Sequence, residues 1–115
     1  MNSLSIFTLA VGLWLLVNGI LHDLFVLRSE YGKQYNRDLL RLLMDGHIMI
    51  TCGLMLLISV SGISGNASWA YYISGAACIS ILIYCAMIFP FLKSVVTILL
   101  NAGLLVFLVI NFLNR

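Results

Sequence analysis

The sequence contains very few charged residues. Lys, Arg, Asp and Glu make up 9% of the 115 residues, and the formal net charge at pH 7 is +2. A soluble domain carries about 25% charged residues, whereas this chain is 63% hydrophobic and has a mean hydropathy of +1.11. The composition excludes an ordinary soluble domain, and the lack of a basic stripe excludes a nucleic-acid partner. It predicts an integral membrane protein whose first partner is the lipid bilayer.

Paired cysteines and the common catalytic motifs are also missing. Cys52, Cys78 and Cys85 form no CxxC pair and lie in apolar stretches, so we expect small buried side chains rather than disulfides. The chain has no HExxH or HxxxH spacing, no hydrolase elbow and no phosphate-binding glycine loop. No metal site is predicted, and the sequence leaves open whether the protein is an enzyme and which cofactor, if any, it uses.

Four apolar stretches have the length of a membrane span, which is about 20 residues. They cover roughly residues 4–27, 39–60, 69–89 and 94–112. Asn36 and Ser94 are placed to cap the second and fourth helices, and Pro90 ends the third. Because short connections favour antiparallel neighbours, the sequence predicts one all-α domain over residues 1–115, an integral membrane antiparallel four-helix bundle.

The basic residues predict an orientation in the membrane. Arg28, Lys33, Arg37 and Arg41 flank the first connection, Lys93 lies in the third, and the second connection has none. Cytoplasmic loops carry the excess of Lys and Arg. We therefore expect a multi-pass protein of the cell membrane, with connections 28–38 and 90–93 cytoplasmic and both termini outside.

Polar side chains interrupt all four spans at a similar depth. With a rise of 1.5 Å per residue, most of them fall about 20–22 Å from the outer end of their span, and His22 falls at about 27 Å. Asp23, close to the end of its span, is expected to be solvated. The shared level predicts a polar pocket in the cytoplasmic half of the membrane. Its expected ligand-binding residues are Asn18, His22, Asp45, His47, Tyr84 and Asn101.

Asp45 and His47 are two residues apart and stand about 160° apart around a helix. They cannot both face the same neighbour, so one is expected to face the interior and the other a lateral helix or a second protomer. A charged group inside the membrane costs roughly 2.5–3.5 kcal/mol. Arg41 lies one turn from Asp45, and the spacing predicts a structural ion pair between them.

Three functions are compatible with polar side chains at a shared depth in the membrane. The first is a pocket that binds a small lipid-soluble ligand or handles protons, since His titrates near neutral pH. The second is a non-catalytic structural or accessory subunit whose buried polar residues hold helices together. The third is a haem or metal redox protein, although the depth difference of about 7 Å between His22 and His47 disfavours a shared upright haem. A homo-oligomer is compatible with all three.

The size of the chain, its four helices and the NGILH turn at Asn18–His22 resemble small DoxX-like bacterial membrane proteins. The DGH stretch at Asp45–His47 has no counterpart in that resemblance. The resemblance implies a four-helix membrane plan and a functionally mixed family, with some members linked to quinone or sulfur redox chemistry. It assigns no catalytic residue to this chain.

Overall fold

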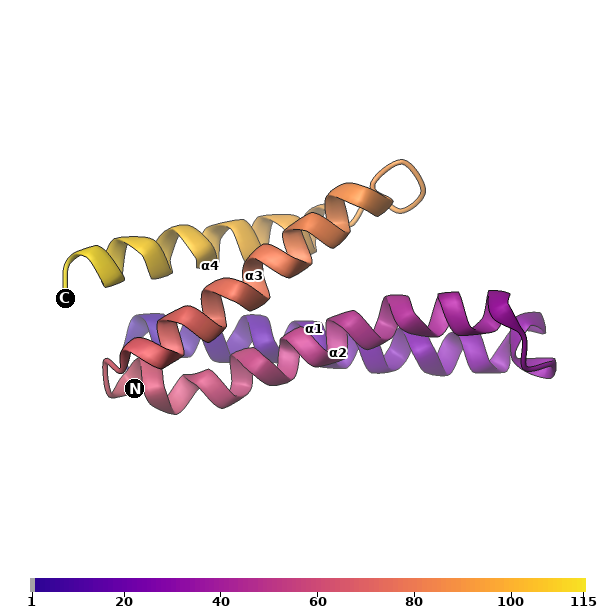
Figure 1. The fold of residues 1–115 in the computed structure, drawn as a ribbon, viewed down its shortest axis with the longest axis horizontal. Coiled ribbons are helices and arrows are strands. Elements are labelled where there is room, and N and C mark those ends of the chain that lie inside the picture. The colour runs from indigo at the N-terminus through magenta and orange to yellow at the C-terminus, as the bar shows by residue number, and fades with distance from the viewer. Residues whose placement is uncertain (1) are drawn as a thin grey trace.

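The computed structural model describes residues 2–115, and all of its regular secondary structure is helical (Figure 1). The long helices are α1 (Ser3–Arg28), α2 (Arg37–Ser64), α3 (Ser68–Ile88) and α4 (Val95–Leu113), with a short 3-10 helix, η1 (Glu30–Lys33), after α1. Each long helix is long and apolar enough to cross a membrane. The predicted all-α, four-span fold is confirmed, and α2 is longer at both ends than the predicted span 39–60.

Only some of the helix ends are capped by the side chains that the sequence predicted. The Leu39 N–H donates to the Asn36 side chain over 2.9 Å, so the predicted cap of α2 is confirmed. Ser94 makes no side-chain capping bond to α4, and that prediction was wrong. Its backbone angles (φ −81°, ψ 61°) are not the extended angles usual for an N-cap residue. α3 ends at Ile88, ahead of Pro90.

α1 and α2 form a tight antiparallel hairpin whose interface contains four glycines. A Cβ atom added to Gly53 would lie 2.8 Å from the Leu16 nitrogen and 2.9 Å from the Gly12 oxygen. A Cβ added to Gly19 would lie 2.8 Å from the oxygen of Gly46. Backbone atoms cannot rotate away as side chains do, so the two helices touch at positions where a side chain has no room. Small residues permit the same close approach in other membrane helix pairs.

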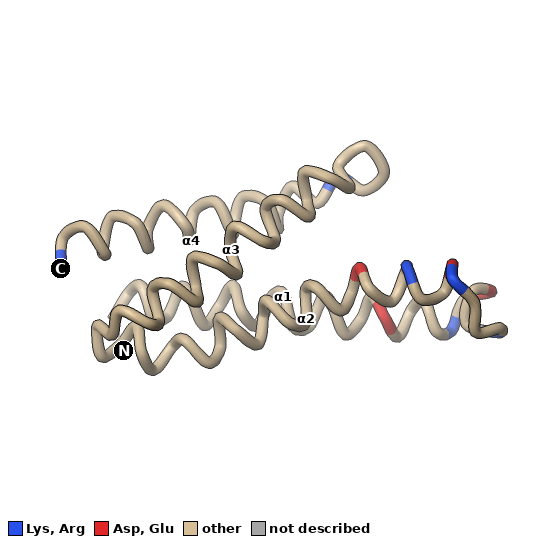
Figure 2. The backbone as a smooth tube through the Cα atoms, in the orientation of Figure 1, with Lys and Arg blue, Asp and Glu red and all other residues tan. Residues whose placement is uncertain are grey.

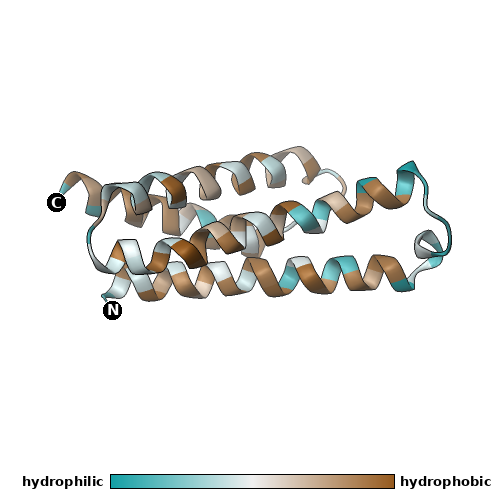
Figure 3. Ribbon diagram, turned by 60° about the horizontal axis from the view of Figure 1, so that its bottom comes forward, coloured by the Kyte–Doolittle hydropathy of each residue, from teal (hydrophilic) through white to brown (hydrophobic). Residues whose placement is uncertain are grey.

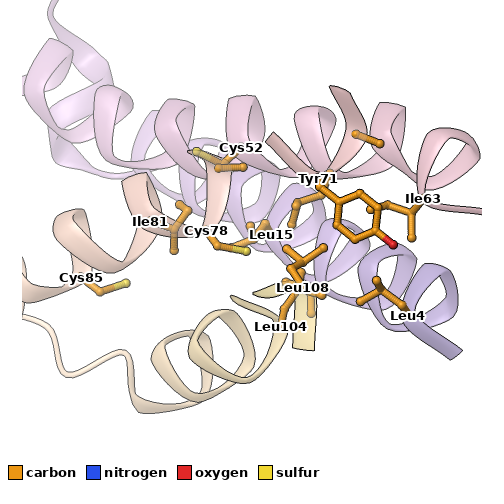
Figure 4. Close-up of a cluster of buried hydrophobic side chains, with 14 residues drawn as sticks. Leu4, Leu15, Cys52, Ile63, Tyr71, Cys78, Ile81, Cys85, Leu104 and Leu108 are labelled. Carbon is orange, nitrogen blue, oxygen red and sulfur yellow. The ribbon is translucent and has the colours of Figure 1, made fainter. Parts of the chain in front are cut away.

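The apolar core is concentrated in the half of the bundle where α1 begins and α4 ends, and α3 extends it to Cys85 near its own last turn (Figures 1 and 4). α1 contributes only residues from its first half, such as Leu4 and Leu15, and α2 only residues from its second half, such as Leu56 and Ile63. Cys52, Cys78 and Cys85 are free and buried, as predicted. In the opposite half of the bundle, the buried core residues come mainly from α3.

α3 and α4 associate with the hairpin unevenly. α3 starts beside the end of α2 and diverges from it along its length (Figure 1). Near that start, the Arg115 guanidinium donates to the Ser68 hydroxyl (2.7 Å) and to the Asn66 carbonyl (2.8 Å), which ties the end of α4 to the α2–α3 turn. At the far end α1 and α2 extend past α3 and α4, and the hydrophilic residues of the hairpin gather there (Figure 3).

Candidate ligand-binding cavity

The charged residues gather at the end of the molecule where α1 and α2 are joined (Figure 2). This end carries acidic and basic side chains of α1, η1 and α2, and Lys93 lies in the α3–α4 connection on the same side. Arg115 lies at the opposite end with the start of α1 (Figure 2). The two ends of the bundle thus differ in polarity, as the distribution of basic residues along the sequence predicted.

A cavity of about 280 Å³ lies beside this polar end, between α1 and the first turn of α4. Trp14, Asn18 and His22 line it from α1, and their spacing of four residues places them on one helix face. Met49 of α2 contributes an apolar patch. The opposite wall is the α3–α4 connection and the start of α4, Leu92 to Thr97, including Lys93 and Ser94.

Three side-chain hydrogen bonds lie within or beside the cavity, and one of them joins α1 to α4. The Trp14 indole Nε1 donates to the Thr97 hydroxyl over 3.2 Å. The Asn18 amide nitrogen donates to the carbonyl of Trp14 (2.7 Å), and the Asn101 amide nitrogen donates to the carbonyl of Thr97 (2.9 Å). Both amides thus bond to their own helix, four residues back. The Trp14–Thr97 bond is the one of these that links two helices.

His22 has an acidic neighbour, Asp23, which was predicted to be solvated. Its Nδ1 lies 3.3 Å from Oδ1 of Asp23, and the two side chains are 30% and 21% exposed. The Asp23 carboxylate fills the space above Gly46 on α2 that a Cβ atom would need. Asp23 therefore packs inside the hairpin, four residues after Gly19 and on the same helix face. With Nδ1 directed to Asp23, Nε2 is the ring nitrogen left for a ligand.

The remaining predicted site residues lie outside this cavity. Asp45 is partly buried and lies close enough to Tyr84 of α3 for the carboxylate and the phenol to interact. His47 is exposed on the outer face of α2. Asn101 is fully buried one turn past Thr97, and its Oδ1 has no hydrogen-bond partner within residues 2–115. Two of the six predicted residues, Asn18 and His22, thus share the cavity.

The ion pairs formed by the described residues are His22–Asp23 and Lys33–Glu30, the latter at 3.1 Å. The predicted Arg41–Asp45 pair is not among them. Arg41 instead lines a shallow surface pocket with Tyr31, Asp38 and Leu42. Asp45 lies near Tyr84 of α3 instead.

The two histidines lie on different sides of the hairpin. His22 lines the cavity toward α4, and His47 is exposed on the outer face of α2. One chain therefore does not present both imidazoles to a single haem. Across residues 2–115 no group of three or more His, Cys, Asp or Glu side chains has an arrangement that could hold a metal ion.

Trp14, Lys93, Ser94 and Thr97 are cavity residues that the sequence analysis did not select. Trp14 could have been found because it precedes Asn18 by four residues on the same face. Lys93 could have been found because the basic residues already assigned the third connection to the same side as the end of α1. No sequence signal paired Thr97 with Trp14, since 83 residues separate them.

A separate apolar groove lies along the α1–α4 interface. It has a volume of about 620 Å³ and is lined by Ile6, Phe7, Val11, Trp14, Leu100 and Phe107, among others. Trp14 lines both the groove and the polar cavity. Trp14 therefore borders both spaces, the more polar one with Asn18 and His22 and the apolar one with Ile6 and Phe7.

No family model, curated protein or solved structure matches this chain. The DoxX-like resemblance of the NGILH turn therefore stays a prediction.

Proposed function

We propose that this small multi-pass membrane protein binds an amphiphilic, lipid-like ligand between α1 and α4. The observation that carries the proposal is that Trp14 lines both a polar cavity of about 280 Å³ and an apolar groove of about 620 Å³. Ligand sites are typically concave, mostly apolar and equipped with a few polar groups that fix orientation. The paired spaces suit a ligand with a polar head and an apolar tail.

The head group is assigned by the donors around the cavity. Lys93 contributes an ammonium, His22 contributes a ring nitrogen, and Ser94 contributes a hydroxyl that makes no capping bond. The first turn of α4 contains no acidic residue, and the N–H groups of a helix N-terminus favour anions. No carboxylate from residues 2–115 lines the cavity, and Asp23 contacts the lining residue His22. These groups favour a head that accepts hydrogen bonds or carries negative charge, such as a phosphate ester.

The tail is assigned by the groove. Its walls are aliphatic and aromatic apart from Ser3 at one end. The groove exists because α1 and α4 touch sparingly, whereas α1 and α2 pack backbone to backbone. An acyl or isoprenoid chain placed here would cover apolar surface on both helices.

The two tryptophans of the chain allow a direct test. Trp69→Phe leaves Trp14 as the sole indole, positioned between head and tail spaces. This protein is placed in phosphatidylcholine nanodiscs with small amounts of brominated phosphatidic acid, and quenching of Trp14 fluorescence is measured. We expect saturable quenching. We also expect Lys93→Gln to weaken the apparent affinity for the brominated phosphatidic acid about 10–100-fold, because a charge-assisted hydrogen bond contributes about 1.5–3 kcal/mol.

Lys33→Gln is the matched control, since it removes the same charge from the exposed η1 helix. Brominated phosphatidylcholine is the matched lipid. Equal quenching by both lipids, unaffected by Lys93→Gln, would show that Trp14 senses bulk lipid and would sink the proposal. If Asn18→Leu and His22→Leu lower thermal stability but leave the quenching unchanged, the structural-subunit alternative is the better one.

We also propose that the polar end of the bundle, with connections 28–38 and 90–93, faces the cytoplasm of the cell membrane. Its support is the cluster of basic residues at that end. A cysteine introduced at Gln34 should then be shielded from a membrane-impermeant thiol reagent in intact cells, and one at Asn114 should be labelled. The native cysteines are buried and give little background. The reverse labelling pattern would overturn this orientation.

A further inference from the structure

Arg115 holds a positive charge in a fixed place with no acidic partner. Its guanidinium donates to the Ser68 hydroxyl and the Asn66 carbonyl, and its Cζ lies 5.3 Å from the centroid of the Tyr71 ring and 5.5 Å from that of Phe112. It forms no ion pair with residues 2–115. All four acidic residues lie between positions 23 and 45, toward the opposite end of the bundle (Figure 2). The counter-ion of this guanidinium must therefore come from outside the bundle.

The two rings beneath the guanidinium also line an apolar groove between α3 and α4. The groove has a volume of about 410 Å³, and both Tyr71 and Phe112 belong to its walls. On α3 it extends from there to Ile79, which is about 10 Å along the helix from Tyr72. Its floor is open at Gly75, where an added Cβ would meet nothing within 4 Å. A bound cation and an apolar groove thus lie next to each other.

Aromatic residues indicate the level of this site in the membrane. Trp69 and Tyr72 lie in the first two turns of α3 and are 44% and 65% exposed. Exposed Trp and Tyr side chains concentrate where the membrane meets water. Arg115 donates to Ser68 and Asn66, directly before these residues. The guanidinium therefore lies at the level of the lipid head groups, and the groove leads from it toward the hydrocarbon.

We infer that this end of the bundle binds one anionic phospholipid, with the phosphate on Arg115 and an acyl chain in the α3–α4 groove. A guanidinium has five N–H donors in a planar fork that suits phosphate oxygens, and the two bonds to Ser68 and Asn66 leave others free. The site is separate from the cavity between α1 and α4, because the two share no lining residue.

The charges of the chain favour this occupant over two others. A zwitterionic lipid also has a phosphate, but its ammonium group would find no carboxylate at this end of the bundle. A second copy inserted with the same orientation would bring another Arg115 to this level and no acidic residue. An anionic lipid supplies the missing charge and leaves no cation unpaired.

A tryptophan placed in the groove wall tests the inference. Trp14→Phe, Trp69→Phe and Tyr72→Trp together leave one indole, at a residue that lines the groove. The protein is placed in phosphatidylcholine nanodiscs with small amounts of brominated phosphatidylglycerol or brominated phosphatidylcholine. We expect half-maximal quenching at an approximately fivefold lower fraction of the anionic lipid, and we expect Arg115→Gln to abolish this preference. Equal quenching by both lipids, or by neither, would overturn the inference.

Two variants separate the charge from other effects. Ser68→Ala removes one bond that fixes Arg115 and keeps the guanidinium, so the preference for the anionic lipid should remain. If it falls as far as in Arg115→Gln, loosening of the helix end explains the result and the inference is wrong. Lys93→Gln should also leave the preference intact, because Lys93 lines the other cavity. A loss there would assign the quenching to the α1–α4 site instead.

The position of the acyl chain is tested by filling the groove. Gly75→Leu places a side chain in space that is open in the bundle, so the helices should still pack, and thermal unfolding in a mild detergent checks this. We expect quenching by brominated phosphatidylglycerol to fall at least twofold. Unchanged quenching in a folded variant would show that no chain occupies the groove.

Discussion

The α1–α2 hairpin and the α3–α4 pair use glycine in opposite ways. In the hairpin, Cβ atoms added to Gly19 or Gly53 would lie within 3 Å of backbone atoms of the facing helix. In the other pair, a Cβ added to Gly75 meets nothing within 4 Å, and one added to Gly103 approaches only the ring of Phe7, at 3.7 Å. Glycine is therefore a packing requirement in one pair and not in the other.

The difference determines where the molecule has empty space. The hairpin has no room for a cavity between its helices at the glycine positions. Between α3 and α4 a groove of about 410 Å³ opens beside Gly75, lined by Tyr71, Leu105 and Phe112 among others. The α1–α4 interface has the larger groove and the polar cavity. A closely packed hairpin that carries Asn18 and His22 faces a more loosely packed pair that carries Lys93 and Thr97.

The largest expected effect comes from adding a methyl group to the hairpin. Gly53→Ala should lower the free energy of unfolding by about 1–3 kcal/mol, the usual cost of overpacking. The atoms that the new Cβ would meet include the backbone of Gly12 and Leu16, so relief requires the helices to separate. Thermal unfolding in a mild detergent, followed by circular dichroism, measures the change.

Gly75→Ala is the matched control for that measurement. The same methyl group enters open space, and alanine is the better helix former by about 1 kcal/mol. The variant should be as stable as the parent or slightly more stable. If the two substitutions have equal effects, the contrast between the helix pairs is wrong.

The fold could be predicted from the sequence because hydropathy alone locates the four spans. The glycine contacts carried a signal as well: Gly12 and Gly19 are seven residues apart, as are Gly46 and Gly53, which places them on matching faces of antiparallel helices. The opposite faces of Asp45 and His47 also followed from helix geometry, and the structure has one partly buried and the other exposed.

Only part of the cavity could be predicted from the sequence. The depth of a residue along its helix does not determine which neighbouring helix its side chain faces. His47 has a similar predicted depth to Asn18 but lies on the outer face of α2. Asp23 appeared solvated because it is close to a charged end, yet the missing side chain of Gly46 gives its carboxylate a place to pack. Such pairings depend on the register of two helices, which periodicity within one helix does not determine.

The smallest expected effect tests how firmly the hairpin holds the α3–α4 pair near the cavity. Trp14→Phe and Thr97→Val each remove one partner of the 3.2 Å bond that links α1 to α4. A double-mutant cycle on unfolding free energies should give a coupling of about 0.6 kcal/mol, the average for side-chain hydrogen bonds between membrane helices. Asn111→Leu combined with Trp14→Phe is the control pair, since Asn111 bonds to Phe107 of its own helix, and its coupling should be near zero. A coupling well above this value would mean that α4 is held tightly to α1. That result would contradict the contrast drawn between a closely packed hairpin and a loosely packed α1–α4 interface.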